Sequence, residues 1–336
     1  MAETRTEIRL ALPSKGRLEL DTLDLLANAG MRVHKPNPRQ LLATIPNLPQ
    51  LAVLFQRAGD IVVSVRDGSV DFGITGWDVV AERNGEGGSV LTLLPELGFG
   101  SCTLNVIVPE SQPEVHRMAH LEGWQARIGR PLRVATKFPR LTRRFFDQHG
   151  VQNVRLISAE GTLEIAPTIG YADLVVDLVS TGTTLRDNRL RMLEDGLILS
   201  SQACLIANRT ALKRSSEVLA VARQLLEFIV AHRRAADNVA ISANMRGESP
   251  QAIASRMFSR SAIGGLQGPT IAPVVTRKPG DTPWYAVNIV VRKDQLAQAI
   301  AELREIGGSG VIVTPVVYIF EEEPEAYRAM LAALEN

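Results

Sequence analysis

The segment Asp173-Leu-Val-Val-Asp-Leu-Val-Ser-Thr-Gly-Thr-Thr-Leu185 combines a strand, a turn of small residues and the beginning of a helix. Its apolar run, residues 174–179, predicts a buried β-strand. The turn offers hydroxyl and backbone N–H groups, and a helix start adds partial positive charge. Gly182 lets a ligand approach the backbone closely because it has no Cβ. The segment therefore predicts a phosphate-binding loop, made of Ser180, Thr181, Gly182, Thr183 and Thr184.

This loop has a second interpretation that the residues leave open. It is neither a Walker motif, since no Gly-Lys-Ser/Thr follows, nor the dinucleotide glycine fingerprint. An ordinary turn between a strand and a helix, capped by a Ser or Thr, has the same composition. In either case the spacing of Leu185, Leu190, Met192 and Leu193 predicts a helix after the turn.

Two carboxylates share one face of the predicted strand. Asp173 and Asp177 are four residues apart, which places them roughly 13 Å from each other. They cannot both bind the same sugar. Asp177, nearer the loop, is the candidate for the hydroxyl groups of a ribose that carries the phosphate. Asp173 is expected to bind a neighbouring loop or cap an element.

Composition limits the class of protein. The 336 residues predict two or three domains, and a hydrophobic fraction of 45% with 22% charged residues is ordinary for a globular protein. A net charge of +1 gives no basic field for nucleic acid. Two cysteines allow neither a disulfide framework nor a Cys-rich zinc site. With no apparent signal peptide and no apolar run of about 20 residues, we expect a cytoplasmic protein without a membrane anchor.

Cationic residues follow predicted strands in the first part of the chain. Residues 8–12 form a short strand, and Lys15 and Arg17 follow before a helix begins at about residue 18. Arg57 similarly precedes a helix. Open α/β sheets bind ligands at the carboxyl ends of their strands, so these cations could bind a polyphosphate. A solvated loop with two charges is the alternative interpretation of Lys15 and Arg17.

The strand–turn–helix order repeats, which favours a mostly parallel sheet. Residues 70–76 form a buried strand that contains Asp71 and ends in a glycine turn. A second α/β unit begins at Thr103 and includes Glu164, an acidic residue that could bind a hydroxyl group or a metal-bound water.

No constellation of residues suits covalent or acid–base catalysis. The five histidines are scattered, and neither cysteine has a histidine nearby in the sequence. His116 and His120 could share a helix face, but two surface histidines are the stronger interpretation because no metalloprotease pattern surrounds them. Phosphate-binding and hydroxyl-binding groups without a nucleophile suit a transfer reaction that depends on positioning and electrostatics. Pyrophosphate with magnesium is a leaving group for such a reaction.

The last hundred residues change in character. After an amphipathic helix, the predicted order is β-α-β-β-α-β, which is the ferredoxin-like arrangement. Because this part carries few candidate catalytic groups, we expect a regulatory or assembly module. The segment after Phe320 is expected to be a solvated surface element.

Several motifs together resemble one family. They lie in the family's order along nearly the whole chain, and the chain is similar to ATP phosphoribosyltransferase, the first enzyme of histidine biosynthesis, in its long form. The motifs are Ala11-Leu-Pro-Ser-Lys-Gly-Arg-Leu18, Arg57-Ala-Gly-Asp-Ile61, Asp71-Phe-Gly-Ile-Thr-Gly76, Leu97-Gly-Phe-Gly100, Val134-Ala-Thr-Lys-Phe-Pro139, Asp177-Leu-Val-Ser-Thr-Gly-Thr-Thr-Leu185 and Leu266-Gln-Gly-Pro-Thr-Ile-Ala-Pro273.

The resemblance implies an α/β fold with two periplasmic-binding-protein-like lobes and a C-terminal ferredoxin-like (ACT-like) regulatory domain. The implied boundaries are 1–102 with 196–214 for the first lobe, 103–195 for the second lobe, 215–237 for a connecting helix, 238–320 for the regulatory domain and 321–336 for a C-terminal extension.

The resemblance also implies a reaction, in which N1 of ATP attacks C1 of phosphoribosyl pyrophosphate and pyrophosphate leaves, with Mg2+ required. Asp177 would bind the ribose hydroxyls and the loop the 5-phosphate. Lys15, Arg17 and Arg57 would contact the pyrophosphate or the ATP phosphates. Asp71 and Glu164 are further substrate-binding candidates. No side chain is assigned to the metal, which the substrate phosphates and water would hold.

Regulation is implied as well. The family is inhibited by histidine at the third domain, has AMP as a competing ligand and forms homo-oligomers from dimer to hexamer. By position, the candidate histidine-site residues are Asn244, Leu266, Gly268 and Thr270, although we expect an acidic residue at position 244 in relatives.

Two other functions fit parts of the chain. A two-lobed sensor that only binds a small molecule is one of them. A purine-salvage phosphoribosyltransferase is another, but such enzymes usually show paired acidic residues before the loop, whereas Asp177 is followed by Leu-Val.

Overall fold

The computed structural model describes residues 7–37, 39–85, 87–158, 161, 163–276 and 282–335. The chain divides into two compact units. The first consists of Met1–Arg223 with Glu325–Asn336, and the second of Gln224–Pro324. Among the helices of these residues, none is both long enough and apolar enough to cross a membrane.

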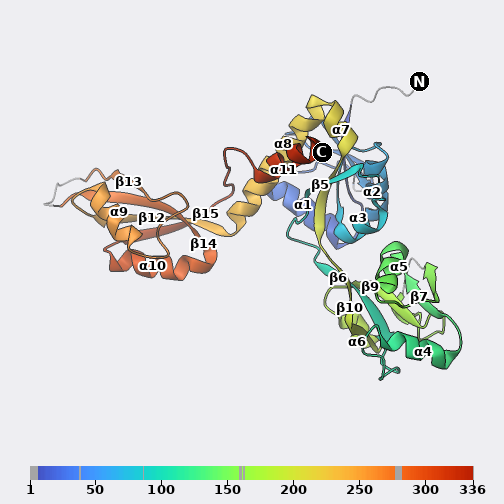
Figure 1. The fold of residues 1–336 in the computed structure, drawn as a ribbon. Coiled ribbons are helices and arrows are strands. Elements are labelled where there is room, and N and C mark those ends of the chain that lie inside the picture. The colour runs from blue at the N-terminus through green and yellow to red at the C-terminus, as the bar shows by residue number, and fades with distance from the viewer. Residues whose placement is uncertain are drawn as a thin grey trace. The chain divides into compact units, whose positions relative to one another are not determined.

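The first unit contains a six-stranded sheet. Its strands are β1 (Ile8–Pro13), β2 (Leu42–Thr44), β3 (Leu51–Gln56), β4 (Phe72–Gly76), β5 (Val90–Leu94) and β11 (Ala203–Asn208). They lie in the order β2-β3-β1-β4-β11-β5. Figure 1 labels β5 of this sheet. β3 and β4 are parallel to β1, whereas β11 is antiparallel to β4 and β5. The turns that follow β1, β3 and β4 therefore lie at one edge of the sheet.

Helices follow these strands, as the sequence predicts. They are α1 (Arg17–Asn28), α2 (Ala58–Arg66), α3 (Trp77–Arg83) and α7 (Arg209–Arg214). All five residues of β4 are buried. A Cβ on Gly73 would lie 2.5 Å from Cγ2 of Ile61, so the glycine allows α2 to pack directly on the sheet.

A five-stranded sheet forms the other half of the first unit. Its strands are β6 (Cys102–Pro109), β7 (Leu132–Thr136), β8 (Val154–Ser158), β9 (Leu174–Val179) and β10 (Leu190–Ser201). Their order is β10-β6-β9-β7-β8. β7 is parallel to β8 and β9, and β6 is antiparallel to β9 and β10. The helices of this half are α4 (His120–Ile128), α5 (Pro139–Gln148), the 3-10 helix η1 (Leu163–Ile165) and α6 (Thr183–Asp187).

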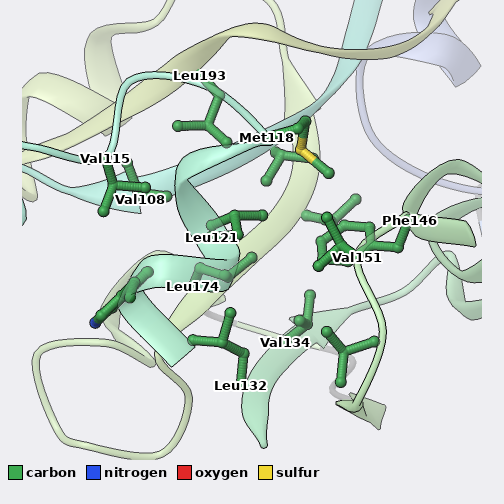
Figure 2. Close-up of a cluster of buried hydrophobic side chains, with 14 of the residues drawn as sticks. Val108, Val115, Met118, Leu121, Leu132, Val134, Phe146, Val151, Leu174 and Leu193 are labelled. Carbon is green, nitrogen blue, oxygen red and sulfur yellow. The ribbon is translucent and has the colours of Figure 1, made fainter. Parts of the chain in front are cut away.

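Apolar side chains cover both faces of this second sheet. Figure 2 shows one cluster, in which Leu121 of α4, Val134 of β7 and Phe146 of α5 are buried together. The opposite face buries Ala135 and Val175 beneath Leu163 and its neighbours. β9 lies between β6 and β7 in the middle of the sheet, which explains its nearly continuous apolar sequence.

The prediction of a helix through Leu190, Met192 and Leu193 is wrong. α6 ends at Asp187, and Leu190–Ser201 is a strand. Arg189 has φ 53, a conformation that interrupts a helix. Leu190 then pairs with Pro109 of β6 and is buried. The spacing of the apolar residues allowed a helix, but the hydrogen bonds and the buried face offered by β6 favour a strand.

The chain crosses between the two sheets twice, through residues 95–101 and through Gln202. Ser201 pairs with Cys102 where the two crossings meet. The return to the first lobe was expected to begin at Gly196, but residues 196–201 still belong to β10 and only β11 joins the six-stranded sheet. The two sheets with their helices give the two α/β lobes of the predicted fold class.

The second unit has the predicted ferredoxin-like order. Its elements are β12 (Asn238–Arg246), α9 (Pro250–Phe258), β13 (Thr270–Pro273), β14 (Trp284–Arg292), η2 (Lys293–Gln295), α10 (Leu296–Glu305) and β15 (Ser309–Pro315). The sheet order is β13-β14-β12-β15, and all neighbours are antiparallel. One face packs on Ile253 of α9 and Leu303 of α10. The opposite face carries Ser242, Asn244 and Asn288, and Asn244 and Asn288 are exposed.

Two helices lie outside these sheets. α8 (Ser216–Ala236) precedes β12, as expected for a connecting helix. α11 (Glu325–Glu335) was expected to be a solvated element, and this expectation is wrong. α11 contacts α7 and β5, Met330 is buried, and Arg209 Nη1 donates to the carbonyl of Ala333 at 2.7 Å. The amphipathic pattern of this helix reflects a packed face.

Candidate functional site

A cavity of about 330 Å³ lies at the end of β9, and we call it the loop cavity. Val175 and Leu190 are among its apolar lining residues. Its polar lining is Glu164, Asp177, Ser180, Thr181, Gly182 and Thr184. The structure therefore brings Glu164 of η1 to the predicted loop, although 13 residues separate Glu164 from Asp177 in the sequence.

The loop leaves the buried strand β9 and turns at Gly182, whose φ is 73°. A side chain would be strained in that conformation, so glycine suits the turn. The hydroxyl oxygens of Thr181 and Thr183 are 3.2 Å apart. Four of the five predicted loop residues line the cavity. The fifth, Thr183, is next to the lining because its hydroxyl contacts that of Thr181. The helix after the loop, α6, has only five residues, so its dipole contributes little to anion binding. The hydroxyl and N–H groups of the loop are therefore the main donors to a ligand.

Asp177 has an unusual electrostatic environment. Burial raises the pKa of its carboxyl above the ordinary value. The N–H of Leu178, which donates to Asp177 Oδ1 at 2.8 Å, and the charge of Lys137 lower this pKa, while the charge of Glu164 raises it. A half-buried carboxylate held in this way is suited to accept hydrogen bonds from hydroxyl groups.

Asp173 is engaged elsewhere, as the sequence predicts. Its carboxylate accepts hydrogen bonds from Arg130 at 2.6 and 2.8 Å, and from the N–H of Arg133 at 2.8 Å. Burial alone would raise the pKa of Asp173, but Arg130 and Arg133 hold it well below its usual range. Asp173 therefore fixes the start of β9 against the start of β7.

Lys15 and Arg57 lie at one edge of the first sheet. Pro13 of β1 pairs with Gln56 of β3, and the N–H of Ser14 donates to the carbonyl of Gln56 at 2.8 Å. The residues just beyond these strand ends, Lys15 and Arg57, are both exposed. The backbone of Arg17 begins α1 at this edge, and its side chain lies outside the described part of the structure. The expected convergence at the carboxyl ends is thus present for Lys15 and Arg57.

The structure places Asp71 at the other end of its strand from Lys15 and Arg57, and its assignment to the substrate site stays a prediction. Asp71 precedes β4, at the amino end of the strand, and is 3% exposed. Its Oδ2 accepts the N–H of Arg9 at 2.8 Å, and its carbonyl accepts the N–H of Asn208. Asp71 therefore joins the starts of β1 and β4 at the edge opposite to Lys15. Sequence order alone did not show on which end of the strand the carboxylate acts.

A second cavity of about 500 Å³ lies at the crossings between the lobes, and we call it the crossing cavity. It shares Val179 and Ser180 with the loop cavity. Trp77, Glu96, Cys102, Thr103 and Gln202 are among its other lining residues. Trp77 follows β4 at the same edge of the first sheet as Lys15 and Arg57. Two ligands could therefore meet at Ser180, one in each cavity.

A buried carboxylate lies behind the crossing cavity. Asp78 Oδ1 accepts a hydrogen bond from Ser201 Oγ at 2.6 Å, and Ser201 Oγ in turn accepts the backbone N–H of Asp78 at 2.9 Å. Burial raises the pKa of Asp78. Burial, with the charge of Asp78, also raises the pKa of Cys102 to about 11 and that of Cys204 to about 12. Both thiols are thus protonated near neutral pH and unsuited to act as nucleophiles.

The candidate histidine-site residues lie in the second unit. Asn244 and Thr270 are exposed, and Asn244 belongs to the sheet face opposite to the helices. Thr270 pairs with Asn288, and Asn244 pairs with Ala286, so both border β14 from opposite sides. Leu266 and Gly268 lie in the segment that leads into β13.

The sequence patterns assigned no role to Lys137, Trp77 or the polar residues of the crossing cavity. Lys137 directly follows β7 and Trp77 directly follows β4, so both stand at carboxyl ends of strands. The rule that selected Lys15 and Arg57 applies equally to these two residues. The crossing cavity itself has no local signal, because residues 77–103 and 179–202 come together only through the fold.

Comparison with known sequences gives two family matches. The model of the family described as ATP phosphoribosyltransferase matches residues 57–229, and that described as HisG, C-terminal domain matches residues 235–318. ATP phosphoribosyltransferase 2, chloroplastic, of Arabidopsis thaliana is 42% identical over 98% of this chain and 81% of that protein. ATP phosphoribosyltransferase of Gemmatimonas aurantiaca is 38% identical over 92% of this chain and 98% of that protein.

A solved structure is also similar. A chain of the ATP phosphoribosyl transferase (HisG:HisZ) complex from Thermotoga maritima aligns with a TM-score of 0.52 and 26% sequence identity. The alignment covers 66% of this chain and 98% of that chain.

Proposed function

Because the chain belongs to the ATP phosphoribosyltransferase family, we propose that its first unit joins phosphoribosyl pyrophosphate and ATP at the boundary between the loop cavity and the crossing cavity. The enzyme is a transferase that catalyses the first step of histidine biosynthesis. This membership favours a transferase over a sensor that only binds a ligand.

The donor occupies the loop cavity in this proposal. Ser180, Thr181, Gly182 and Thr184 surround its 5-phosphate, with Thr183 supporting Thr181. Asp177 and Glu164 accept hydrogen bonds from the ribose hydroxyls. The position of both carboxylates on the lining of one cavity supports this assignment, because each has acceptor oxygens and a ribose offers neighbouring donors.

The acceptor occupies the crossing cavity. Its adenine lies near Ser180, where the two cavities share their lining. Lys15, Arg17 and Arg57 contact phosphate groups from the carboxyl edge of the first sheet. The exposure of Lys15 and Arg57 at adjacent strand ends supports this role, since Lys and Arg bind phosphates through charged hydrogen bonds.

The reaction follows from this placement. A bond forms between N1 of adenine and C1 of the ribose while the bond from C1 to the pyrophosphate oxygen breaks, and pyrophosphate leaves with the electron pair. The raised thiol pKa values of Cys102 and Cys204 support a direct transfer without an enzyme-bound intermediate. The protein then contributes alignment of N1 with C1 and electrostatic stabilisation of the charge that develops on both.

The family's reaction requires a divalent metal, and we propose Mg2+. Among the described residues no cluster of three or more metal-ligating side chains exists, so substrate phosphates and water would supply the ligands. Held in this way, the ion would neutralise charge on the pyrophosphate.

Regulation forms a further part of the proposal. Histidine inhibits the enzyme through the second unit, with Asn244, Leu266, Gly268 and Thr270 as candidate contacts, and AMP competes at the substrate site. The enzyme assembles as a homo-oligomer, between a dimer and a hexamer. We place it in the cytoplasm, and its two unpaired cysteines support a reducing compartment.

The observation that carries the proposal is the shared lining of the two cavities at Ser180. The test is to incubate the protein with ATP, phosphoribosyl pyrophosphate and magnesium and to follow the ultraviolet absorbance of the adduct. Omission of either substrate is the control. Adduct formation that depends on both substrates supports the proposal, whereas folded protein that forms no adduct overturns it.

A further inference from the structure

The loop cavity has an unbalanced set of charges. Its lining residues include the carboxylates of Glu164 and Asp177, while none of the lining residues that the structure describes is a Lys or Arg. The loop supplies only neutral donors. A sugar phosphate that entered this cavity would place its anionic oxygens near two carboxylates, so a cation close by is needed to balance them.

The register of the second sheet places such a cation beside Asp177. β7 and β9 are parallel neighbours in which Ala135 pairs with Val175 and Thr136 pairs with Val176. The next residues along the two strands are Lys137 and Asp177. Neighbouring strands lie about 5 Å apart, so the backbones of Lys137 and Asp177 are close together.

The side chains of Lys137 and Asp177 lie on the same face of the sheet, just beyond its last paired residues. Ala135 and Val175 point to the face that packs under Leu163. Because side chains alternate along a strand, Lys137 continues the line of Ala135, and Asp177 that of Val175. Glu164 follows Leu163 in η1, which covers this face. Lys137, Asp177 and Glu164 therefore reach the same end of the same face from three separate elements.

The turn that carries Lys137 is held firmly while its side chain is exposed. The N–H of Phe138 donates to Thr136 Oγ1 at 2.9 Å, and Thr142 Oγ1 donates to the carbonyl of Phe138 at 2.6 Å. Glu82 of the first lobe accepts the N–H of Arg140 at 2.8 Å. The backbone on both sides of Lys137 is thus fixed, while its flexible side chain can bring the ammonium group to a bound anion.

We propose that Lys137 is a substrate-binding residue whose ammonium contacts an anionic oxygen of the sugar phosphate donor and balances Asp177 and Glu164. This inference rests on the proposed function, since it names the cation for the donor half of the same site. It also separates Lys137 from Lys15 and Arg57, which stand on the first lobe.

The electrostatics of Asp177 agree with this placement. Burial and Glu164 raise the pKa of Asp177, whereas Lys137 lowers it, so Lys137 helps to keep the carboxylate ionised. Among the described residues, Cys102 of β6 also interacts with the charge of Asp177, and burial raises the pKa of this thiol. Replacement of Lys137 by a neutral residue is therefore expected to raise the pKa of Asp177 further.

The test compares Lys137→Met, Lys137→Arg and the control Arg144→Met. Arg144 is exposed on α5 and is outside both cavities' linings. Calorimetry measures binding of phosphoribosyl pyrophosphate with magnesium and without ATP. We expect Lys137→Met to weaken binding by about tenfold or more, as for loss of one charged hydrogen bond. Lys137→Arg should retain most of the affinity, and Arg144→Met should match the wild type.

A pH profile provides a readout that a structural role would not change. The acid limb of kcat/KM for the donor should move to higher pH in Lys137→Met and return in Lys137→Arg, while KM for ATP stays within about twofold. Donor affinity and an acid limb that are both unchanged in Lys137→Met would overturn the inference. In that case adduct formation by the wild type would leave the proposed function standing, whereas a wild type that forms no adduct would refute the proposed function itself.

Discussion

Glu82 and Arg140 cap each other's helices between the two lobes. The carboxylate of Glu82 accepts the N–H of Arg140 at 2.8 Å and that of Leu141 at 2.9 Å, at the start of α5. In return, Arg140 Nε donates to the carbonyl of Glu82 at 2.8 Å, and its guanidinium also contacts the carbonyl of Ala81 at the end of α3. The contact joins the lobes at a place separate from the two chain crossings.

Glu82→Ala should reduce the free energy of unfolding by about 1 kcal/mol, because the first N–H groups of α5 lose their acceptor. Urea unfolding at pH 7 measures this change. Glu122→Ala, in the exposed first turn of α4, is the matched control and should stay within about 0.5 kcal/mol of the wild type. Equal stability of the two variants would show that the contact contributes nothing to folding.

Asp173→Asn should destabilise the protein at neutral pH by about 1–3 kcal/mol, since Arg130 and Arg133 lose a charged acceptor. The pKa of Asp173 is lowered in the folded state, so its stabilising effect is present above the unfolded-state value of about 3.9 and is lost as the pH falls further. Unfolding measured from pH 7 to pH 3 should show a difference between variant and wild type that is constant above about pH 4 and begins to narrow toward pH 3. A difference that grows toward low pH would contradict this account.

Asp177→Asn should lower kcat/KM for the donor by about tenfold or more, because the amide is a weaker acceptor for ribose hydroxyls. The same change should raise stability at pH 7. The pKa of Asp177 is raised on folding, so ionising it costs stability at neutral pH, and the benefit of Asn should vanish below about pH 4. Steady-state kinetics and thermal unfolding test the two effects separately. A variant that loses both activity and stability would indicate a structural role instead.

Asn244→Ala should weaken inhibition by histidine if the open sheet face of the second unit binds the effector. The loss of one hydrogen-bond partner predicts an inhibition constant raised by roughly fivefold or more. The ratio of inhibited to uninhibited rate, measured over a range of histidine concentrations, gives the result directly. Ser255→Ala on α9, on the helical side of this unit, is a suitable comparison. Identical inhibition curves for Asn244→Ala and the wild type would remove Asn244 from the proposed site.

Local patterns correctly predicted the strand, the turn and the helix start around residues 180–184. Strand, turn and helix onset are encoded within residues 173–187, so the loop and the separation of Asp173 from Asp177 follow from neighbouring residues. The same local reasoning was wrong for residues 190–193. Their spacing permits a helix, and pairing with β6, a strand about 85 residues earlier, makes them a strand.

Asp71 and Lys137 both show that the position of a residue in the sequence does not decide which groups its side chain meets. Asp71 belongs to a family-like motif, yet the structure uses its carboxylate to hold Arg9 at the far end of the strand. Lys137 lies in another such motif and was given no role from the sequence, although the register of β7 and β9 brings it level with Asp177.

The sequence by itself determined the α/β class, the ferredoxin-like order of the second unit, and the strand–turn–helix order of residues 174–187, because each depends on residues close together in the chain. Only the tertiary structure decided which charges meet. Glu164, Asp177 and Lys137 come from three elements, and their effect on one another depends on distances that strand order and register set. Electrostatic energy falls with distance in space, whatever the separation along the chain.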